Sequence, residues 1–365
     1  MELQNFITTT ENYQQELKKY NLNVKKHSKR KLLLVKYYKD KEYDFVENPW
    51  IRYCRGAVIN TETNKVVCIP PPKAYPVNDI SAVMDVDTPT KEYQLLIDGT
   101  MINLFYHNNE WVFSTRSSLG ANNSWDGKVS FRKMFEEAVS SDKWMDNLQK
   151  DYCYSFVLVH KNNRIVSPVI ENNVYLVENY KIGETIKRVP LDTIEGIENV
   201  MTFTSEKLTS YMDPNLLFSV KGFTVKNETS KRLRWLNPMY EYVSNLKMNY
   251  NDKLLNYIGL RRNGTLREYL TYFPEESYEF SRYRDSFHNI KMDVLKYYSD
   301  HFVNKTLDKK EIPYEYKPLL YELHGDYLRT GDSRNERIVG EYLHSLPEKK
   351  FMFVYNYYKA RVLQG

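Results

Sequence analysis

The chain has 365 residues, and 52 basic against 47 acidic side chains give it a net charge of +5. This length is typical of two domains, and hydrophobic residues, at 42% of the chain, suffice for a sizeable core. The near balance of charge excludes a histone-like basic protein and an acidic disordered tail, but it permits a local basic patch. Because no apolar run reaches 18 residues, we expect no membrane-spanning helix.

The cysteine content and the N-terminus predict the compartment. Cys54, Cys68 and Cys153 are too few for a disulfide framework, and the first residues show neither a basic leader nor an apolar core. Both features predict a cytoplasmic protein. Tyrosine is plentiful, with 32 residues, whereas glycine has 13 and proline 14, a bias typical of an AT-rich genome such as that of a large DNA virus or a protist. A viral origin would make the compartment the host cytoplasm, and a functional tyrosine surface is the alternative explanation of the bias.

The first fifty residues predict a helix, a basic loop and a strand. An N-cap and an acidic first turn at residues 8–11 precede apolar side chains at helical spacing. The basic residues 25–31 predict a solvated loop or, alternatively, a loop that faces phosphate. The apolar residues 32–38 predict a buried strand.

Residues 50–245 predict short antiparallel strands separated by turns that contain Asn and Asp. One helix is expected at residues 131–139. The expected strands cover residues 56–60, 65–69, 93–97, 101–106, 111–116, 155–159, 173–177 and 222–226.

From residue 246 the apolar pattern becomes helical, with helices expected at 285–300, 316–328 and 337–346. This segment has 20 basic and 17 acidic residues, and a charge of only +3 argues against a dedicated nucleic-acid domain. We therefore predict an α+β protein, with an antiparallel-sheet domain over residues 1–245 and an all-helical domain over residues 246–365.

Seven short motifs follow one another between residues 53 and 235. They are YCRGAV (53–58), IPPPKAY (69–75), LIDGT (96–100), FSTRS (113–117), FVLVHKNNRIV (156–166), VKGF (220–223) and KRLRW (231–235). This succession resembles the phage RNA ligase 1 family of covalent nucleotidyltransferases, a superfamily that includes DNA ligases and mRNA-capping guanylyltransferases. The resemblance implies an antiparallel, ligase-like nucleotidyltransferase fold for the first domain.

The resemblance also implies a chemistry for these motifs. In the family, the lysine of K-x-D-G attacks the α-phosphate of ATP and becomes covalently bound to the nucleotide. A glutamate on a strand and the glutamate of E-G-x-V help hold the ribose, the lysine and the divalent metal. A K-x-K pair contacts the α-phosphate and stabilises the charge that develops there.

This sequence departs from the family at the catalytic positions. Leu96 stands where the nucleophile is expected, and it has no lone pair with which to attack. Val157 and Lys221 replace the two glutamates. The exchanges change the charge by −1, +1 and +2, so the pocket is about two units more positive than the family's, which disfavours a carboxylate-held metal and favours phosphate oxygens.

The resemblance implies nucleotide or phosphate contacts for seven side chains, and for three of them, Arg55, Lys73 and Arg116, a role in salt bridges is the alternative. The seven are Arg55, Lys73, Asp98, Arg116, Lys221, Arg232 and Arg234. Arg232 and Arg234 represent the K-x-K pair, unless the pair starts at Lys231, and arginine keeps the charge and can grip phosphate with two donors. Tyr175 and Phe223 lie where the family clasps the base, so they are base-stacking candidates or else core aromatic residues.

Three functions remain open from the sequence. The first is a catalytically silent, RNA-ligase-like protein that binds a nucleotide or an RNA 5′ end, with the mRNA cap as one such end, and that needs no metal or cofactor. The second is an active RNA ligase that uses ATP and Mg²⁺ with a displaced nucleophile, for which Lys73 and Lys91 are candidates. The third is a scaffold whose C-terminal helices dock a partner protein, which a large exposed apolar helix face would indicate.

Overall fold

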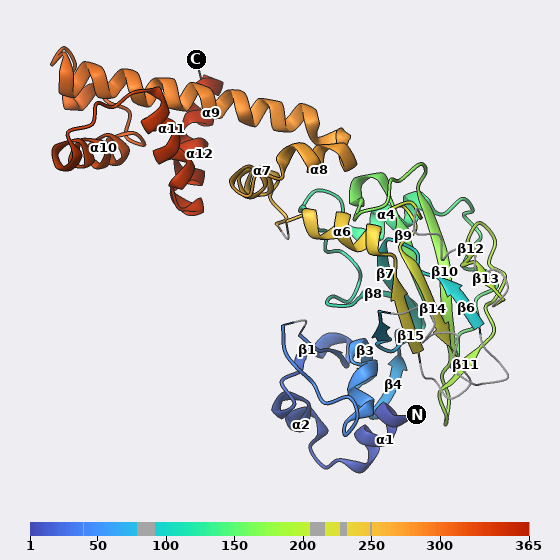
Figure 1. Cartoon of the computed structure of the whole chain (residues 1–365). Helices are drawn as coiled ribbons and strands as arrows, with labels where there is room; N and C mark the ends of the chain where they lie inside the picture. Colours follow the sequence, from blue (N-terminus) through green and yellow to red (C-terminus); the bar gives the residue numbers. More distant parts are fainter. Residues whose placement is uncertain (39, 79–91, 205–215, 227–231, 249, 365) are drawn as a thin grey trace. The chain divides into compact units, whose positions relative to one another are not determined.

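The computed structural model describes residues 1–38, 40–78, 92–204, 216–226, 232–248 and 250–364. The chain divides into two compact units, Met1–Ser244 and Asn245–Gly365. Figure 1 colours the first unit from blue to yellow and the second in orange and red. Along the described part of the chain, no helix combines the length and the apolar character that a membrane crossing needs.

The first sheet along the chain is antiparallel and has the order β1-β2-β3-β4. Its strands are β1 (Asn23–His27), β2 (Leu32–Lys36), β3 (Arg55–Asn60) and β4 (Lys65–Cys68). Both faces of β2 are covered, because Leu33 and Val35 pack with α1 (Glu2–Thr9) and α2 (Tyr13–Lys19), while Leu32 and Leu34 join a second apolar cluster. This double burial explains the unbroken apolar run that predicted the strand.

Two local predictions for this region are wrong. The expected N-cap at residues 8–11 is the end of α1, because the hydroxyls of Thr8 and Thr9 donate to the carbonyls of Gln4 and Asn5 one turn earlier. Asn12, in the left-handed conformation with φ 56°, then separates α1 from α2. The basic loop expected at 25–31 is in part strand β1, which pairs with β2.

The second sheet carries α4 (Phe131–Ala138) on one face, and large apolar side chains of both fill the space between them. Its order is β11-β10-β9-β7-β8, with β12 beside β10. The strands are β7 (Thr100–His107), β8 (Glu110–Thr115), β9 (Tyr152–Val159), β10 (Asn173–Lys181), β11 (Lys187–Val189) and β12 (Glu198–Asn199). Helix α4 confirms the helix that was expected at 131–139. The Ser130 side chain caps it by accepting a hydrogen bond from the Lys133 N–H.

The third sheet has the order β13-β6-β14-β15-β5, and only its β15–β5 pair is parallel. Its strands are β5 (Tyr75–Val77), β6 (Glu92–Leu95), β13 (Thr202–Phe203), β14 (Gly222–Lys226) and β15 (Arg232–Leu236). Side-chain bonds join it to β10 of the second sheet, since Gln94 donates to the Val177 carbonyl and Arg232 to Glu178. Helix α6 (Pro238–Leu246) follows β15.

The second unit is helical and is organised around the long helix α9 (Ser277–Tyr298), which α7, α10, α11 and α12 contact. The other helices are α7 (Lys253–Arg262), α8 (Leu266–Tyr272), α10 (Lys317–Thr330), α11 (Glu336–Ser345) and α12 (Glu348–Gln364). In Figure 1, α7 and α8 lie near the start of α9 and α10 lies near its end. The structure thus confirms the predicted α+β class, with antiparallel sheets followed by a helical C-terminal region.

Candidate functional site

The Asp98-Gly99 turn links three parts of the first unit. Asp98 Oδ2 accepts the backbone N–H groups of Val166 and Ser167, each at 2.8 Å, and Oδ1 accepts from the Tyr240 hydroxyl at 2.5 Å. Burial opposes ionisation, but Lys221 Nζ at 3.2 Å and these hydrogen bonds lower the pKa of Asp98. Gly99 is required because an added Cβ would lie 2.3 Å from the Leu158 carbonyl oxygen.

Asp98 and Lys221 therefore neutralise each other. Donors surround the carboxylate on both oxygens, and the ammonium group of Lys221 also donates to the Ile97 carbonyl. The sequence predicted that both residues contact nucleotide. In the structure, their salt bridge and the hydrogen bonds of Asp98 join the turn to the 166–167 segment and to α6.

A second group of charges surrounds Glu178 on β10, whose side chain is only 2% exposed. Its carboxylate lies 2.6 Å from Arg232 Nη1, 2.7 Å from Arg188 Nε and 3.3 Å from Lys226 Nζ. Burial alone would raise the pKa of Glu178, but Arg232, Lys226 and Arg188 lower it to about 2. The guanidinium of Arg232 also bonds Thr224 and Gln94. Arg232 is thus a structural salt-bridge partner, and each of its three guanidinium nitrogens donates to a protein atom.

The burial of several cations side by side lowers the pKa of Lys226. Desolvation, together with repulsion by Arg232 and Arg188, outweighs the attraction of Glu178 and lowers the pKa of Lys226 to about 7. We call Glu178, Arg188, Lys226 and Arg232 the Glu178 cluster. The motif analysis missed Glu178 and Lys226. The two-residue alternation of β14 could have found Lys226, since Thr224 and Lys226 pair with Arg234 and Arg232 and share their face.

Four other cations form what we call the cationic cluster: Arg55, Lys73, Arg116 and Arg234. Desolvation and repulsion by Arg116, Arg232 and Arg234 lower the pKa of Arg55. Desolvation and repulsion by Arg55, Arg234, Arg52 and Arg116 likewise lower the pKa of Lys73. Within the part of the chain that the structure describes, no carboxylate forms an ion pair with any member of the cationic cluster.

The backbone brings the cationic cluster together. Gly56, with φ +108°, follows Arg55, and a Cβ added to it would lie 2.8 Å from the Arg116 Cα. Only glycine therefore allows β3 to approach the end of β8 at this point. Arg234 reaches the same region from β15, and its buried Nε has no hydrogen-bond partner among the described residues. A buried donor without an acceptor is costly, and a bound anion would satisfy it.

Aromatic rings line one side of the cationic cluster. Lys73 Nζ lies 4.3 Å from the centre of the Phe45 ring, and the Arg116 guanidinium lies 4.7 Å from that of Tyr37. The rings of Tyr37 and Phe45 are 6.0 Å apart. These rings hold the cations without neutralising them. The sequence analysis did not identify Tyr37 or Phe45, because they lie outside the motifs.

The positions of the family's nucleophile and glutamates are apolar or cationic here. Leu96 directly follows β6, and its N–H donates to the Gly222 carbonyl at 2.9 Å. Val157 packs with Val177 and Val200 between the sheets. No three acidic, histidine or cysteine side chains gather as metal ligands within the described ranges. These residues do not fit the family's divalent metal, since Glu178 is enclosed by three cations and Lys221 replaces a carboxylate.

The two base-stacking candidates lie in different surroundings. Phe223 is 1% exposed and stacks on Trp235 with ring centres 5.1 Å apart. It is a core aromatic residue, and this burial corrects the expectation that it stacks on a base. Tyr175 is half-buried beside Val157 and Val177, and burial, with a smaller effect of Glu198, raises the pKa of its hydroxyl. A role of Tyr175 in base stacking stays a prediction. Lys91 and Lys231 lie outside the described residues.

Comparisons with known proteins agree with the motif order. The chain is 27% identical over 166 residues to a protein of Autographa californica nuclear polyhedrosis virus described as a bifunctional polynucleotide kinase/RNA ligase, a match to 41% of this chain and 24% of that protein. It is 22% identical over 185 residues to the immediate-early protein ICP-46 homolog of Invertebrate iridescent virus 3, a match to 47% of this chain and 40% of that protein. The matches thus span under half of either relative. No family model matches the chain.

A solved archaeal ATP-dependent RNA ligase has a TM-score of 0.43 and 13% identity, covering 75% of this chain and 78% of its own. The sequence match to the viral protein confirms the predicted resemblance to RNA-ligase-like nucleotidyltransferases. Both relatives are viral proteins.

Proposed function

We propose that this RNA-ligase-like chain binds the phosphorylated 5′ end of an RNA, or a nucleotide, without transferring it. The observation that carries the proposal is the cationic cluster: Arg55, Lys73, Arg116 and Arg234 lie together without a carboxylate partner in the described part of the chain. Four like charges repel one another, so an anion that brings several negative oxygens would stabilise them. A triphosphate or a 5′-phosphorylated end has that chemistry.

The lack of transfer follows from the reacting positions. Nucleotidyl transfer of the family's kind needs a nucleophilic amine two residues before Asp98, and Leu96 supplies a hydrocarbon. It also needs charge stabilisation at the reacting phosphate. Of the two arginines at the K-x-K positions, Arg232 is already bound to Glu178. Arg234 alone keeps donors available, which suits binding better than catalysis.

The mRNA cap is the finer form of this proposal. A capped end joins a methylated, cationic guanine to a triphosphate, and such a base gains from an aromatic face. Tyr175 is the base-stacking candidate that remains, because Phe223 is packed in the core. The proposed recognition of the cap base therefore depends on Tyr175 alone, whereas the proposed phosphate binding depends on the four side chains of the cationic cluster.

The experiment compares one RNA with a 5′-triphosphate and with a 5′-hydroxyl, by fluorescence anisotropy at fixed salt. We expect the wild-type protein to prefer the triphosphate by about tenfold, and Lys73→Gln/Arg234→Gln to remove most of that preference. A matched control is Lys65→Gln/Lys187→Gln, which removes two exposed cations outside the cationic cluster. Equal affinity of the wild-type protein for the two ends, or a preference that survives Lys73→Gln/Arg234→Gln, would contradict the proposal.

A second candidate function is an active ligase that uses Lys73 as a displaced nucleophile. Its support is the lowered pKa of Lys73, because desolvation by burial and then the neighbouring cations favour the neutral, nucleophilic amine. Against it, the amine lies over the Phe45 ring, whereas attack needs alignment with the α-phosphate. A labelled covalent adduct lost in Lys73→Arg would favour this function over silent binding.

A third candidate is a scaffold that docks a protein. Three partly exposed rings of the helical unit contact one another: Tyr314, Phe353 and Tyr357. They form a small apolar surface for which no partner is indicated, so we place this candidate last.

A further inference from the structure

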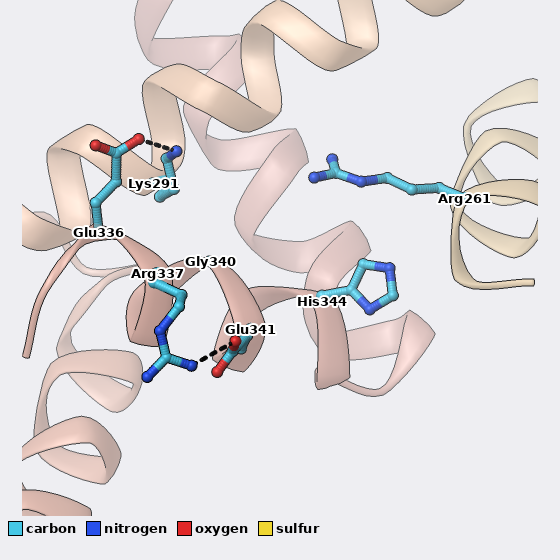
Figure 2. A pocket seen from close by; sticks show the side chains of 7 residues that line it. All are labelled: Arg261, Lys291, Glu336, Arg337, Gly340, Glu341 and His344. Atoms are coloured by element: carbon cyan, nitrogen blue, oxygen red, sulfur yellow. Dashed lines mark hydrogen bonds and ion pairs between the residues drawn. The ribbon is translucent and has the colours of Figure 1, made fainter. Parts of the chain in front are cut away.

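The helical unit has a hollow of about 690 Å³ between α7, α9 and α11, outside the RNA-ligase-like motifs. Figure 2 shows its charged lining: Arg261 from α7, Lys291 from α9, and Glu336, Arg337, Glu341 and His344 from α11. We propose that this hollow binds the phosphate backbone of an RNA strand, in addition to the contact that the cationic cluster makes. The choice of RNA as the polyanion rests on the proposed function.

The carboxylates of the hollow are already paired. Glu336 bonds Lys291, and Glu341 accepts from Arg337 at 2.8 Å. Arg261 has no carboxylate partner in the described helical unit, and Figure 2 shows its guanidinium reaching from α7 toward the opposite wall. Three cations against two carboxylates leave the hollow positive, even though the whole helical segment is only +3.

The paired cations can still bind phosphate. The side chains of Arg337 and Glu341 are 70% and 62% exposed, so water screens their attraction and the pair is weak. An arginine has five N–H donors, and one carboxylate occupies only part of them. A phosphate can therefore add to Arg337, or displace Glu341 from it, at little cost.

The backbone fixes the walls of the hollow. Arg262, next to Arg261, donates to the His344 carbonyl at 3.1 Å and to the Leu346 carbonyl, which attaches the end of α7 to the end of α11. The Arg261 guanidinium lies 4.2 Å from the centre of the Phe287 ring on α9. Lys291 runs close to Gly340, where an added Cβ would lie 3.5 Å from its Cδ. The cations are thus held on a formed surface, which limits the entropy lost on binding.

A strand fits this hollow better than a free phosphate ion. Along α9, Arg284, His288 and Lys291 follow at spacings of four and three residues, so they lie on one face of the helix. Seven residues of helix extend about 10 Å, so this row is longer than one phosphate group. A single phosphate would reach one part of this row, whereas a strand can contact the row and the hollow together.

The test uses the full chain and a labelled 20-nucleotide single-stranded RNA with a 5′-triphosphate, titrated at several salt concentrations. For Arg261→Gln/Arg337→Gln we expect about tenfold weaker RNA binding and a salt slope smaller by about 1.4, because each lost single-strand contact contributes about 0.7. Arg337→Gln alone, at an exposed position, should lose about fourfold, so an unstable Arg261 variant does not block the test. The matched control, Arg329→Gln/Lys349→Gln, removes two exposed cations that do not line the hollow.

GTP serves as the second ligand, because the proposed function assigns a nucleotide triphosphate to the cationic cluster alone. We expect the hollow variants to bind GTP with the affinity of the wild-type protein. Lys73→Gln/Arg234→Gln should bind GTP more weakly. RNA affinity of the hollow variants equal to that of the control would overturn the hollow proposal, and so would an equal loss of GTP and RNA binding. A normal GTP affinity of Lys73→Gln/Arg234→Gln would instead overturn the proposed function. A wild-type protein that binds neither ligand would overturn both.

Discussion

Arg232 and Arg234 lie two residues apart on one face of β15, and the structure predicts opposite consequences of losing them. Arg232 bonds Glu178, Thr224 and Gln94, whereas Arg234 has a buried Nε without a described partner. Breaking a buried ion pair costs about 3–5 kcal/mol. Because Glu178 keeps Arg188 and Lys226, we expect Arg232→Gln to cost about 3 kcal/mol, the lower end of that range.

The expected shift in melting temperature follows from the size of the first unit, Met1–Ser244. At about 2–4 °C per kcal/mol, Arg232→Gln should lower Tm by about 6–12 °C. Arg234→Gln should leave Tm within about 2 °C of wild type or raise it, because it relieves repulsion, and should reduce the salt slope of RNA binding by about 0.7. Differential scanning fluorimetry and anisotropy titrations measure the two effects. The reasoning is refuted if Arg234→Gln destabilises as much as Arg232→Gln, or if Arg232→Gln leaves Tm unchanged.

Three other predictions concern pH, chemistry and the base. The pKa of Glu178 is about 2 in the folded protein and 4.5 in the unfolded chain, so its stabilising effect is present above pH 4.5 and is lost as the pH falls toward 2. The pKa of Lys226 is about 7 in the folded protein and 10.5 in the unfolded chain, so the free energy of unfolding should rise between pH 7 and pH 10.5. Urea midpoints against pH check both, and an unchanged pH profile in Glu178→Gln and Lys226→Met would contradict them. Incubation with labelled ATP or GTP and Mg²⁺ or Mn²⁺ should give no covalent adduct. A labelled band that survives denaturation and maps to a lysine would contradict this prediction. Leu96→Lys alone should not restore ligation, because Val157 and Lys221 remain. If the bound RNA 5′ end is a methylated cap, calorimetry should show that the protein binds the methylated cap analogue several-fold more tightly than the unmethylated one, and Tyr175→Ala should remove most of this preference. Equal affinities for the two analogues would exclude the cap.

Much of the fold could be predicted from the sequence, because its apolar patterns are strong. Short apolar segments between turn residues predicted strands β7 and β8. The helical spacing of Phe287, Ile290, Val294, Leu295 and Tyr298 predicted one face of α9, and all of them except the half-buried Leu295 are buried. The predicted helix with Tyr13 and Leu17 is present as α2, but its N-cap was placed wrongly, because Thr8 and Thr9 are as suitable for the last turn of a helix as for an N-cap. Their hydroxyls can bond carbonyls one turn earlier, which local sequence does not decide.

The candidate site was predicted less completely, because the partner of a charge depends on three-dimensional neighbours. Motif order selected Arg55, Lys73, Arg116 and Arg234, which the structure brings together. It also selected Arg232, whose partner Glu178 lies 54 residues away on another sheet. A count of charges in the motifs assigned the positive excess partly to Lys221, which Asp98 neutralises. The excess in the structure lies in the cationic cluster.

The most direct measurement of the central claim is a crystal structure of the protein soaked with GTP and, separately, with a cap analogue. The account predicts triphosphate oxygens within hydrogen-bond distance of Arg55, Lys73 and Arg234, with the nucleotide not covalently attached and Leu96 unmodified. Density continuous between a lysine and the α-phosphate would contradict the silent-binding claim. A triphosphate bound away from the cationic cluster would contradict the assignment of the site.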